Sequence, residues 1–265
     1  MSEPQVLLEI KDLSVTYRRG SDGVHAVKNC SLSVARGEVI GLVGESGSGK
    51  SSILMSIPKL LPPGTIVTGQ IFCDGQELSK LSEKEMNQWR WRRIALVPQG
   101  AMNSFTPHLT IERHITEVLE HHMRATGPES AERAASLIKT VGLDDDVPRR
   151  YPHELSVGQK QRAALAVALA CEPDFLLADE PTTALDVITQ QEVLQTIISA
   201  ARERGMGLLL VTHDLPLASG VCDKLIVMKD GAIVESGPSR ELTSAPREDY
   251  TKLLINAITD MEPPS

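Results

Sequence analysis

Residues 44–51, GESGSGKS, decide the fold class of this chain. They match the pattern G-x-x-x-x-G-K-[ST] and stand between an apolar run, EVIGLVG at 38–44, and a helical run, KSSILMSIPKL at 50–60. In this strand–loop–helix context the pattern is typical of a loop whose backbone N–H groups surround a chain of phosphates. The stretch therefore predicts a nucleotide-phosphate site on an α/β domain.

Each residue type in this loop has its own expected task. Gly44, Gly47 and Gly49 let the backbone wrap closely around the phosphates. Lys50 is expected to reach the β- and γ-phosphates, and Ser51 to offer its hydroxyl to Mg²⁺. The remaining loop residues complete the predicted phosphate site: Glu45, Ser46, Ser48 and, at the start of the helix, Ser52.

A second stretch, FLLADE at 175–180, supplies the acids that such a site needs. An apolar strand pattern ends there in two adjacent carboxylates. We expect Asp179 to hold the Mg²⁺ shell and Glu180 to polarise the attacking water. Two acids after an apolar strand are often only a strand end, but the intact phosphate loop gives this pair a chemical task.

Composition and charge limit the classes of protein to which this chain can belong. Hydrophobic residues make up 41% of the 265 residues, enough for a well-buried core, and the net charge of −8 argues against a non-specific nucleic-acid binder but leaves room for a local basic patch. The longest apolar runs are too short to cross a bilayer, and no signal peptide is expected, because residues 1–12 have no basic region followed by an apolar stretch. The four cysteines are widely spaced, so we expect a reduced chain without disulfides or structural zinc: Cys30, Cys73, Cys171 and Cys222.

The order of strand and helix patterns predicts an α/β core with a helical insertion. Short β-type runs and helical runs alternate over about 1–100 and again over 170–245, which favours a mainly parallel sheet. Residues 101–169 have helical spacing and no strand pattern, so they are expected to form a helical subdomain. Residues 246–265 are expected to form one helix and a frayed end.

Six motifs in a fixed order make the chain resemble the ATP-binding subunits of ABC transporters. GESGSGKS resembles their Walker A motif, FLLADE their Walker B motif, and LSVGQKQR at 155–162 their signature motif. VPQ with Gln99, TALD with Asp186 and VTHD with His213 resemble the Q-loop, the D-loop and the switch histidine. The resemblance implies a P-loop NTPase (RecA-like) core with an N-terminal antiparallel β subdomain and an inserted α-helical subdomain, in a single ATP-binding cassette over 1–258.

This resemblance also implies roles for single residues around bound ATP and Mg²⁺. Glu180 would be the general base, and His213 would bind the γ-phosphate and hold the attacking water. Gln99 would contact Mg²⁺ or the water and report the nucleotide state to the helical region. Tyr17 would lie on the adenine, and Asp186 would lie beside the nucleotide.

The resemblance implies that the signature stretch would complete a site on a second subunit rather than on its own chain. Family members dimerise head to tail, so Ser156 and the N–H of Gly158, with Gln159 beside them, would face the γ-phosphate held by the partner. Position 157 is Val, where LSGGQ is the commonest form. Because a β-branched residue is strained at positive φ, we expect Val157 to have an ordinary negative φ.

Three further stretches resemble the peptide and nickel importers of this family: 60–78, 98–111 and 244–254. The implied partners are a second, non-identical ATPase, two membrane permease subunits and an extracytoplasmic solute-binding protein. The chain would be peripheral, at the cytoplasmic face of the inner membrane, with its helical region docked on the permease. Peptides are the expected cargo, and nickel or another metal complex is the alternative.

Two functions from other classes compete with transport. A soluble ABC ATPase that acts on nucleic acid or ribosomes would be expected to carry long inserted domains or two cassettes, and this acidic chain has one cassette with a short insertion. A nucleotide-binding regulator without turnover would not need Lys50, Asp179, Glu180 and His213 together. The adjacent histidines at 121–122 lack the spacing of a helical metal pair, so they are expected on a solvated face.

Overall fold

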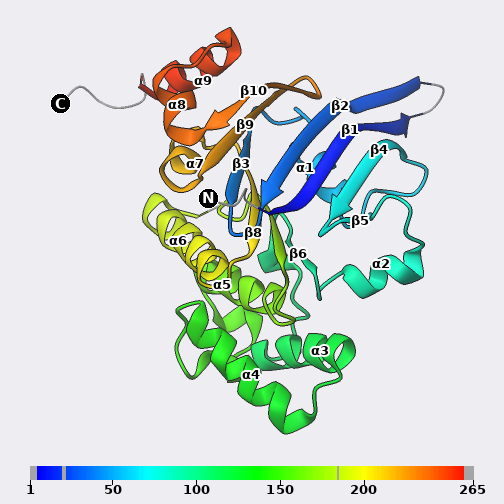
Figure 1. The fold of residues 1–265 in the computed structure, drawn as a ribbon. Coiled ribbons are helices and arrows are strands. Elements are labelled where there is room, and N and C mark those ends of the chain that lie inside the picture. The colour runs from blue at the N-terminus through cyan, green and yellow to red at the C-terminus, as the bar shows by residue number, and fades with distance from the viewer. Residues whose placement is uncertain (1–4, 20–21, 184, 260–265) are drawn as a thin grey trace. The chain divides into compact units, whose positions relative to one another are not determined.

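The computed structural model describes residues 5–19, 22–183 and 185–259 (Figure 1). Its internal contacts group the chain into two compact units, residues 1–86 with 207–265 and residues 87–206. This grouping differs from the predicted division into core and helical subdomain, which therefore remains a prediction. The predicted frayed end beyond residue 259 and the alanine of the TALD motif, Ala184, lie outside the described residues.

An antiparallel sheet of order β2-β1-β4-β5 forms one layer of the first unit, and Figure 1 shows β1, β2 and β4 side by side. Leu8 and Ile10 of β1 are buried, whereas Glu9 between them is half-buried, as expected for a strand with one face on a core. Asp74 and Gly75 both have positive φ, which makes a tight hairpin turn between β4 and β5. The strands of this sheet are β1 (Val6–Arg19), β2 (Asp22–Ala35), β4 (Ile66–Cys73) and β5 (Gln76–Glu77).

The first unit also holds the predicted parallel strands. β3 (Val39–Val43) pairs in parallel with both β8 (Gly207–Thr212) and β9 (Lys224–Lys229), and β10 (Ala232–Pro238) runs antiparallel to β9. Every residue of β3 and β8 is buried, which explains why both read as unbroken apolar runs. Val43 pairs with Thr212, so the loops that follow β3 and β8 begin at the same edge of the sheet.

Helices of the first unit are short. The helix predicted at residue 50 ends before Pro58, as expected for a residue that cannot continue a helix. Two helices that the sequence did not predict, α7 and α8, have only one to two turns, too few for a clear periodic pattern. The helices of this unit are α1 (Lys50–Ser56), α7 (Leu215–Val221), α8 (Ser239–Ser244) and α9 (Asp249–Thr259).

At the sequence boundary of the two units lies α2 (Glu83–Trp89). The Ser82 hydroxyl accepts from the N–H of Glu85, and the Glu85 carboxylate accepts from the N–H of Ser82. This reciprocal pair is a capping box and satisfies two N–H groups at the helix start.

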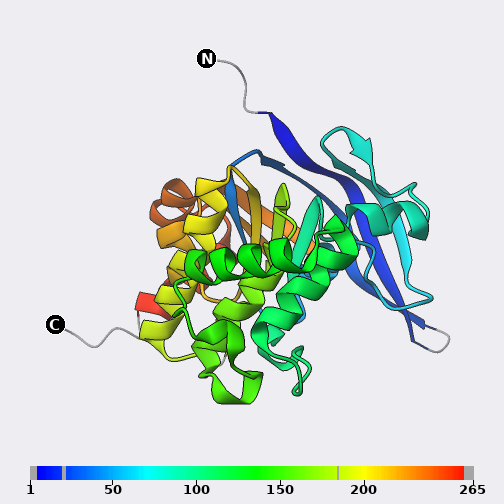
Figure 2. The same cartoon turned by 90° about the horizontal axis from the view of Figure 1, so that it is seen from below.

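In the second unit, β6 (Ile94–Val97) pairs in parallel with β7 (Phe175–Asp179). The described residues between these strands form helices and turns, as predicted, and Figure 2 shows α3 and α4 side by side. Across the described residues, no helix has the length and apolar character needed to span a membrane. The helices of this unit are α3 (Ile111–Met123), α4 (Gly127–Thr140), α5 (Val157–Ala168) and α6 (Val187–Glu203), and its 3-10 turns are η1 (Ala101–Asn103), η2 (Val147–Arg149) and η3 (Pro152–Glu154).

Candidate active site

The phosphate loop, residues 44–51, joins the buried end of β3 to the start of α1. Gly44 has φ 149° and Gly49 has φ 102°. A Cβ added at Gly44 would lie 2.2 Å from the carbonyl oxygen of Met228, and one added at Gly49 would lie 2.2 Å from that of Ala26. Only glycine fits at these two positions, because any other residue would strike neighbouring backbone.

Lys50 lies inside this loop, with only 4% of its surface exposed. Its ammonium donates to the carbonyl oxygens of Gly44 and Glu45, both at 2.8 Å, and to the Ser48 hydroxyl at 3.3 Å. A buried ammonium needs such acceptors, because desolvation of an unpaired charge is costly. The loop therefore holds a positive charge at the centre of a ring of backbone groups, which suits an anionic ligand.

The predicted adenine-side residue, Tyr17 on β1, lies at the start of α1. Its hydroxyl is 3.0 Å from the hydroxyl of Ser52. Ser51 lies one residue before Ser52, and Glu45, Ser46 and Ser51 are exposed. The first unit thus brings Tyr17 to the phosphate loop, although 35 residues of sequence separate Tyr17 from Ser52.

His213 follows β8 at the same sheet edge as the phosphate loop, because its neighbour Thr212 pairs with Val43. Thr212 accepts at its hydroxyl from the N–H of Asp214 at 3.0 Å, and Asp214 caps α7 by accepting from the N–H of Leu217 at 2.9 Å. These bonds fix the backbone on one side of His213 and leave its side chain exposed.

The acids of the second unit end β7. Asp179 is 2% exposed, and Glu180 has a left-handed φ of 44°. The Glu180 carboxylate accepts from the Gln99 amide at 3.1 Å and from the Thr183 hydroxyl at 3.1 Å. The structure therefore brings the predicted base and the predicted Q-loop glutamine into direct contact. Thr183 was not predicted, because a threonine beside a motif carries no signal of its own.

Ser156 and Gln159 form a reciprocal cap at the start of α5. The Ser156 hydroxyl accepts from the N–H of Gln159 at 3.2 Å, and the Gln159 side chain accepts from the N–H of Ser156 at 3.0 Å. Val157 is the first helical residue and has no positive φ, as predicted, and it is 41% exposed. A Cβ at Gly158 would lie 2.6 Å from Thr189 Cγ2, so this glycine is also needed for α5 to pack against α6.

Asp186 has a structural task within its own chain. Its carboxylate caps α6 by accepting from the N–H of Thr189 at 3.0 Å and from the Thr189 hydroxyl at 2.7 Å. The hydroxyl bond, followed by the backbone bond, lowers the pKa of Asp186 below its ordinary value. The cap therefore stays ionised at neutral pH.

The expectation that the adjacent histidines, His121 and His122, both lie on a solvated face is correct only for His121. His121 is exposed, as expected, but His122 is half-buried and its ring lies 5.9 Å from that of Trp91. Burial, together with the positive charges of His121 and Arg92, lowers the pKa of His122. His122 is therefore a packed, neutral residue rather than part of a solvated face.

The donor set of the predicted metal site suits Mg²⁺. It consists of oxygen atoms from the Ser51 hydroxyl, the Gln99 amide and the Asp179 carboxylate, which are the hard ligands that Mg²⁺ prefers. Within the described residues, no group of three or more His, Cys, Asp or Glu side chains could hold a metal alone. Magnesium that keeps water and phosphate oxygens as ligands needs only one or two protein carboxylates, so the residues fit.

Comparison with known proteins identifies the family. A family model described as ABC transporter matches residues 27–183. The chain is 42% identical over 264 residues to the peptidoglycan transport ATP-binding protein YejF of Agrobacterium fabrum, and it covers 48% of that protein. It is 38% identical over 257 residues to the dipeptide transport ATP-binding protein DppD of Escherichia coli K12, and it covers 79% of that protein and matches over 96% of its own length.

A solved structure supports the same family. The ATP-binding cassette MJ0796, in a dimeric post-hydrolysis state bound to ADP and Pi, superposes with a TM-score of 0.79 and 32% identity. The match covers 88% of this chain and 99% of that one. The predicted fold class is thereby confirmed.

Proposed function

Because the chain belongs to the ABC transporter family, which is built on ATP-binding and ATP-hydrolysing cassettes, we propose that it powers import of peptides through a separate membrane permease. Its relatives named above are described as ATP-binding subunits for dipeptide and peptidoglycan transport. Peptides are the cargo class that fits these names. The observation that carries the proposal is the contact between Gln99 and Glu180, which joins the hydrolytic acid to the segment that leads into the helical region.

In the proposed hydrolysis, each site residue has its own task. The N–H groups of the phosphate loop and Lys50 bind and orient the phosphates, and Glu180 accepts a proton from the attacking water. His213 binds the γ-phosphate, and Tyr17 lies on the adenine. Magnesium, held by Ser51, Asp179 and Gln99, would supply neutralisation of the phosphate charge.

A second cassette would complete the site. Ser156, Gly158 and Gln159 at the start of α5, with Asp186 at the start of α6, would face the nucleotide of that partner. The dimeric state of the cassette MJ0796 supports this arrangement. The partner is proposed to be a non-identical relative.

A cavity of 760 Å³ in the second unit is suited to receive the permease. Pro98 lines this cavity and directly precedes Gln99 in the chain. A permease helix bound in the cavity would therefore lie beside the segment that contacts Glu180. Its apolar wall would pack against an amphipathic helix of the permease. The apolar residues of this docking cavity are Pro98, Ala101, Phe105, Val118, Ala164 and Val167.

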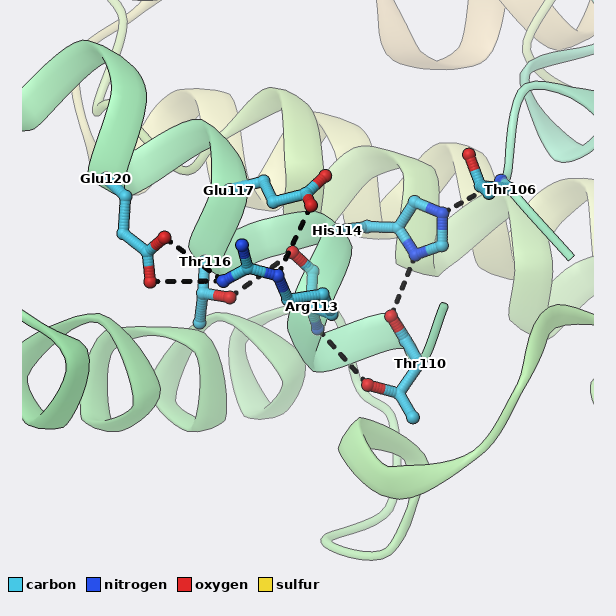
Figure 3. A network of polar contacts seen from close by, with 7 residues as sticks. All are labelled: Thr106, Thr110, Arg113, His114, Thr116, Glu117 and Glu120. Atoms are coloured by element: carbon cyan, nitrogen blue, oxygen red, sulfur yellow. Dashed lines mark hydrogen bonds and ion pairs between the residues drawn. The ribbon is translucent and has the colours of Figure 1, made fainter. Parts of the chain in front are cut away.

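Polar side chains of α3 also line the docking cavity, and several of them belong to one network of polar contacts (Figure 3). Arg113 pairs with Glu117 at 3.2 Å and with both carboxylate oxygens of Glu120 at 3.1 and 3.2 Å. These charges hold one another in place and would meet polar groups at the end of a docked helix. The lining of the docking cavity therefore combines charged and apolar residues, as protein–protein interfaces commonly do.

His114 fixes the loop that borders this cavity (Figure 3). Its Nε2 accepts from the N–H of Thr106 at 2.9 Å, so its Nδ1–H must donate to the carbonyl oxygen of Thr110 at 2.8 Å. Both bonds require the neutral ring with its proton on Nδ1. The loop between Thr106 and Thr110 is therefore held against α3 by one side chain.

Purification of the tagged chain from gently solubilised membranes tests the proposal. We expect two permeases and a second ATPase to co-purify, with the chain peripheral at the inner membrane face. The solute-binding protein of that system should then bind peptides. Recovery only from the soluble fraction, together with ribosomal or DNA-associated proteins, would contradict import, and a binding protein that selects a metal complex would contradict the peptide cargo.

A further inference from the structure

The C-terminal helix α9 contacts the phosphate loop through the hydroxyl of Tyr250. Tyr250, in the first turn of α9, accepts at its hydroxyl oxygen from the N–H of Glu45 at 3.2 Å. Both residues belong to the first unit, although 205 residues of sequence separate them. No feature of hydrolysis described above uses α9, so this contact has no assigned task.

The peptide unit that Tyr250 contacts also holds the phosphate-binding lysine. The N–H of Glu45 and the C=O of Gly44 belong to the same planar amide. Lys50 donates to that C=O at 2.8 Å, and Tyr250 accepts from the N–H on the opposite side. A rotation of this amide would break both bonds at once, because its donor and acceptor turn together.

Tyr250 is itself held firmly. Its ring lies under the ammonium of Lys229, at 4.8 Å from the ring centroid, at the end of β9. Burial, together with the negative charges of Glu45 and Asp230, raises the pKa of Tyr250 above its ordinary value. The hydroxyl is therefore neutral across the physiological range.

The start of α9 is anchored to β10, on the same unit as the loop. The Glu235 carboxylate accepts from the N–H groups of Arg247 and Glu248 at 2.9 and 3.2 Å, just before the helix begins. Thr251, the residue after Tyr250, is fully buried. These contacts fix the position from which Tyr250 reaches the loop.

We propose that Tyr250 is a positioning residue for nucleotide binding, which holds the Gly44–Glu45 amide in the orientation that keeps Lys50 inside the phosphate loop. Binding of nucleotide and docking of α9 are then coupled, because each stabilises the same orientation of this amide. The C-terminal helix thereby takes part in the nucleotide site without touching the nucleotide. The inference rests on the nucleotide-binding role of the loop proposed above.

The test compares Tyr250→Phe with the wild-type full chain in ADP binding and ATPase assays. The variant keeps the ring under Lys229 and removes the hydroxyl that accepts from the N–H of Glu45, so we expect ADP affinity to fall about two- to tenfold. The KM for ATP should rise by a similar factor while kcat changes less than about twofold. Tyr151→Phe removes an exposed tyrosine hydroxyl elsewhere and is the matched control.

A second variant, Glu235→Ala, releases the start of α9 while Tyr250 is kept. It should also lower ADP affinity. The double variant should bind ADP with about the same affinity as the single variant that binds less tightly, because both changes act through the same contact. ADP should also slow hydrogen exchange over residues 251–259 in the wild type and not in Tyr250→Phe. A lower melting temperature with unchanged ADP affinity and KM would overturn the positioning role. Wild-type protein that binds no ADP would overturn the proposed function itself.

Discussion

In the phosphate loop, Gly44 and Gly49 bring backbone against the carbonyl groups of Met228 and Ala26, and backbone groups surround Lys50. Around the docking cavity, side chains do the equivalent work, since Arg113 and His114 hold neighbouring residues through their own donors and acceptors. A backbone-built site tolerates no added atoms but carries few titratable groups. A side-chain-built site tolerates changes of size but depends on charge and tautomer.

The largest effect should follow from Gly44→Ala. The added Cβ would meet the Met228 carbonyl oxygen at 2.2 Å, and the φ of 149° disfavours any L side chain. We expect ADP affinity to fall at least about a hundredfold, with a loss of thermal stability, measured by calorimetric titration and melting. Gly127→Ala is the control, because its Cβ would meet nothing within 4 Å. Normal ADP binding by the Gly44→Ala variant would contradict the claim that the backbone-built phosphate loop tolerates no added atoms.

Glu180→Gln should give the next largest effect, and it should separate binding from chemistry. The amide is nearly isosteric with the carboxylate but cannot take a proton from water, so kcat should fall about 10²- to 10⁴-fold. ADP affinity should stay within a few-fold of wild type, because the phosphate loop is unchanged. Steady-state ATPase assays and ADP titration measure both quantities. Hydrolysis at the wild-type rate would exclude Glu180 as the base.

A smaller effect is expected from His114→Ala, which tests the side-chain-built wall. Loss of the bonds to Thr106 and Thr110 frees the loop at the edge of the docking cavity. The ratio of permease-stimulated to free-subunit ATPase activity should fall several-fold in reconstituted vesicles. His108→Ala, at an exposed position three residues before α3, is the control. If the two variants gave the same ratio of stimulated to free-subunit activity, His114 would have no role in docking.

The smallest effect is a pH dependence at Asp186. Because hydrogen bonds from Thr189 lower its pKa in the folded chain, its cap is fully present above the ordinary carboxylate pKa and is lost as the pH falls through the lowered value. Melting temperature measured from about pH 6 to about pH 3 should therefore decline less steeply in Asp186→Asn, whose amide caps at any pH. Parallel curves would mean that this cap contributes nothing to the acid limb.

Much of the phosphate loop and of the buried strands beside it could be predicted from sequence. GESGSGKS requires left-handed glycines at fixed spacing, and the apolar runs of β3 and β8 require burial on both faces. The motifs predicted that Gln99 and Glu180 belong to the same nucleotide site. They did not predict the hydrogen bond between the two side chains.

The side-chain-built contacts could not be predicted in the same way. The bond from Glu45 to Tyr250 joins residues that are distant in sequence, and neither residue type is unusual at its position. His114 could not be distinguished from other helical histidines until Thr106 lay beside it. Gly158 was predicted for its approach to a phosphate, but its packing against Thr189 depends on how α5 crosses α6.

With Glu180 as the proposed base, its left-handed φ of 44° would set stability against turnover at a single residue. A non-glycine residue in this conformation costs about 1–3 kcal/mol, which glycine would recover. Selection for folding alone would therefore favour Gly at position 180, and a chain that had lost its need to hydrolyse ATP should drift towards it. Under the proposed mechanism, the carboxylate would persist at this strained position only as long as catalysis requires it.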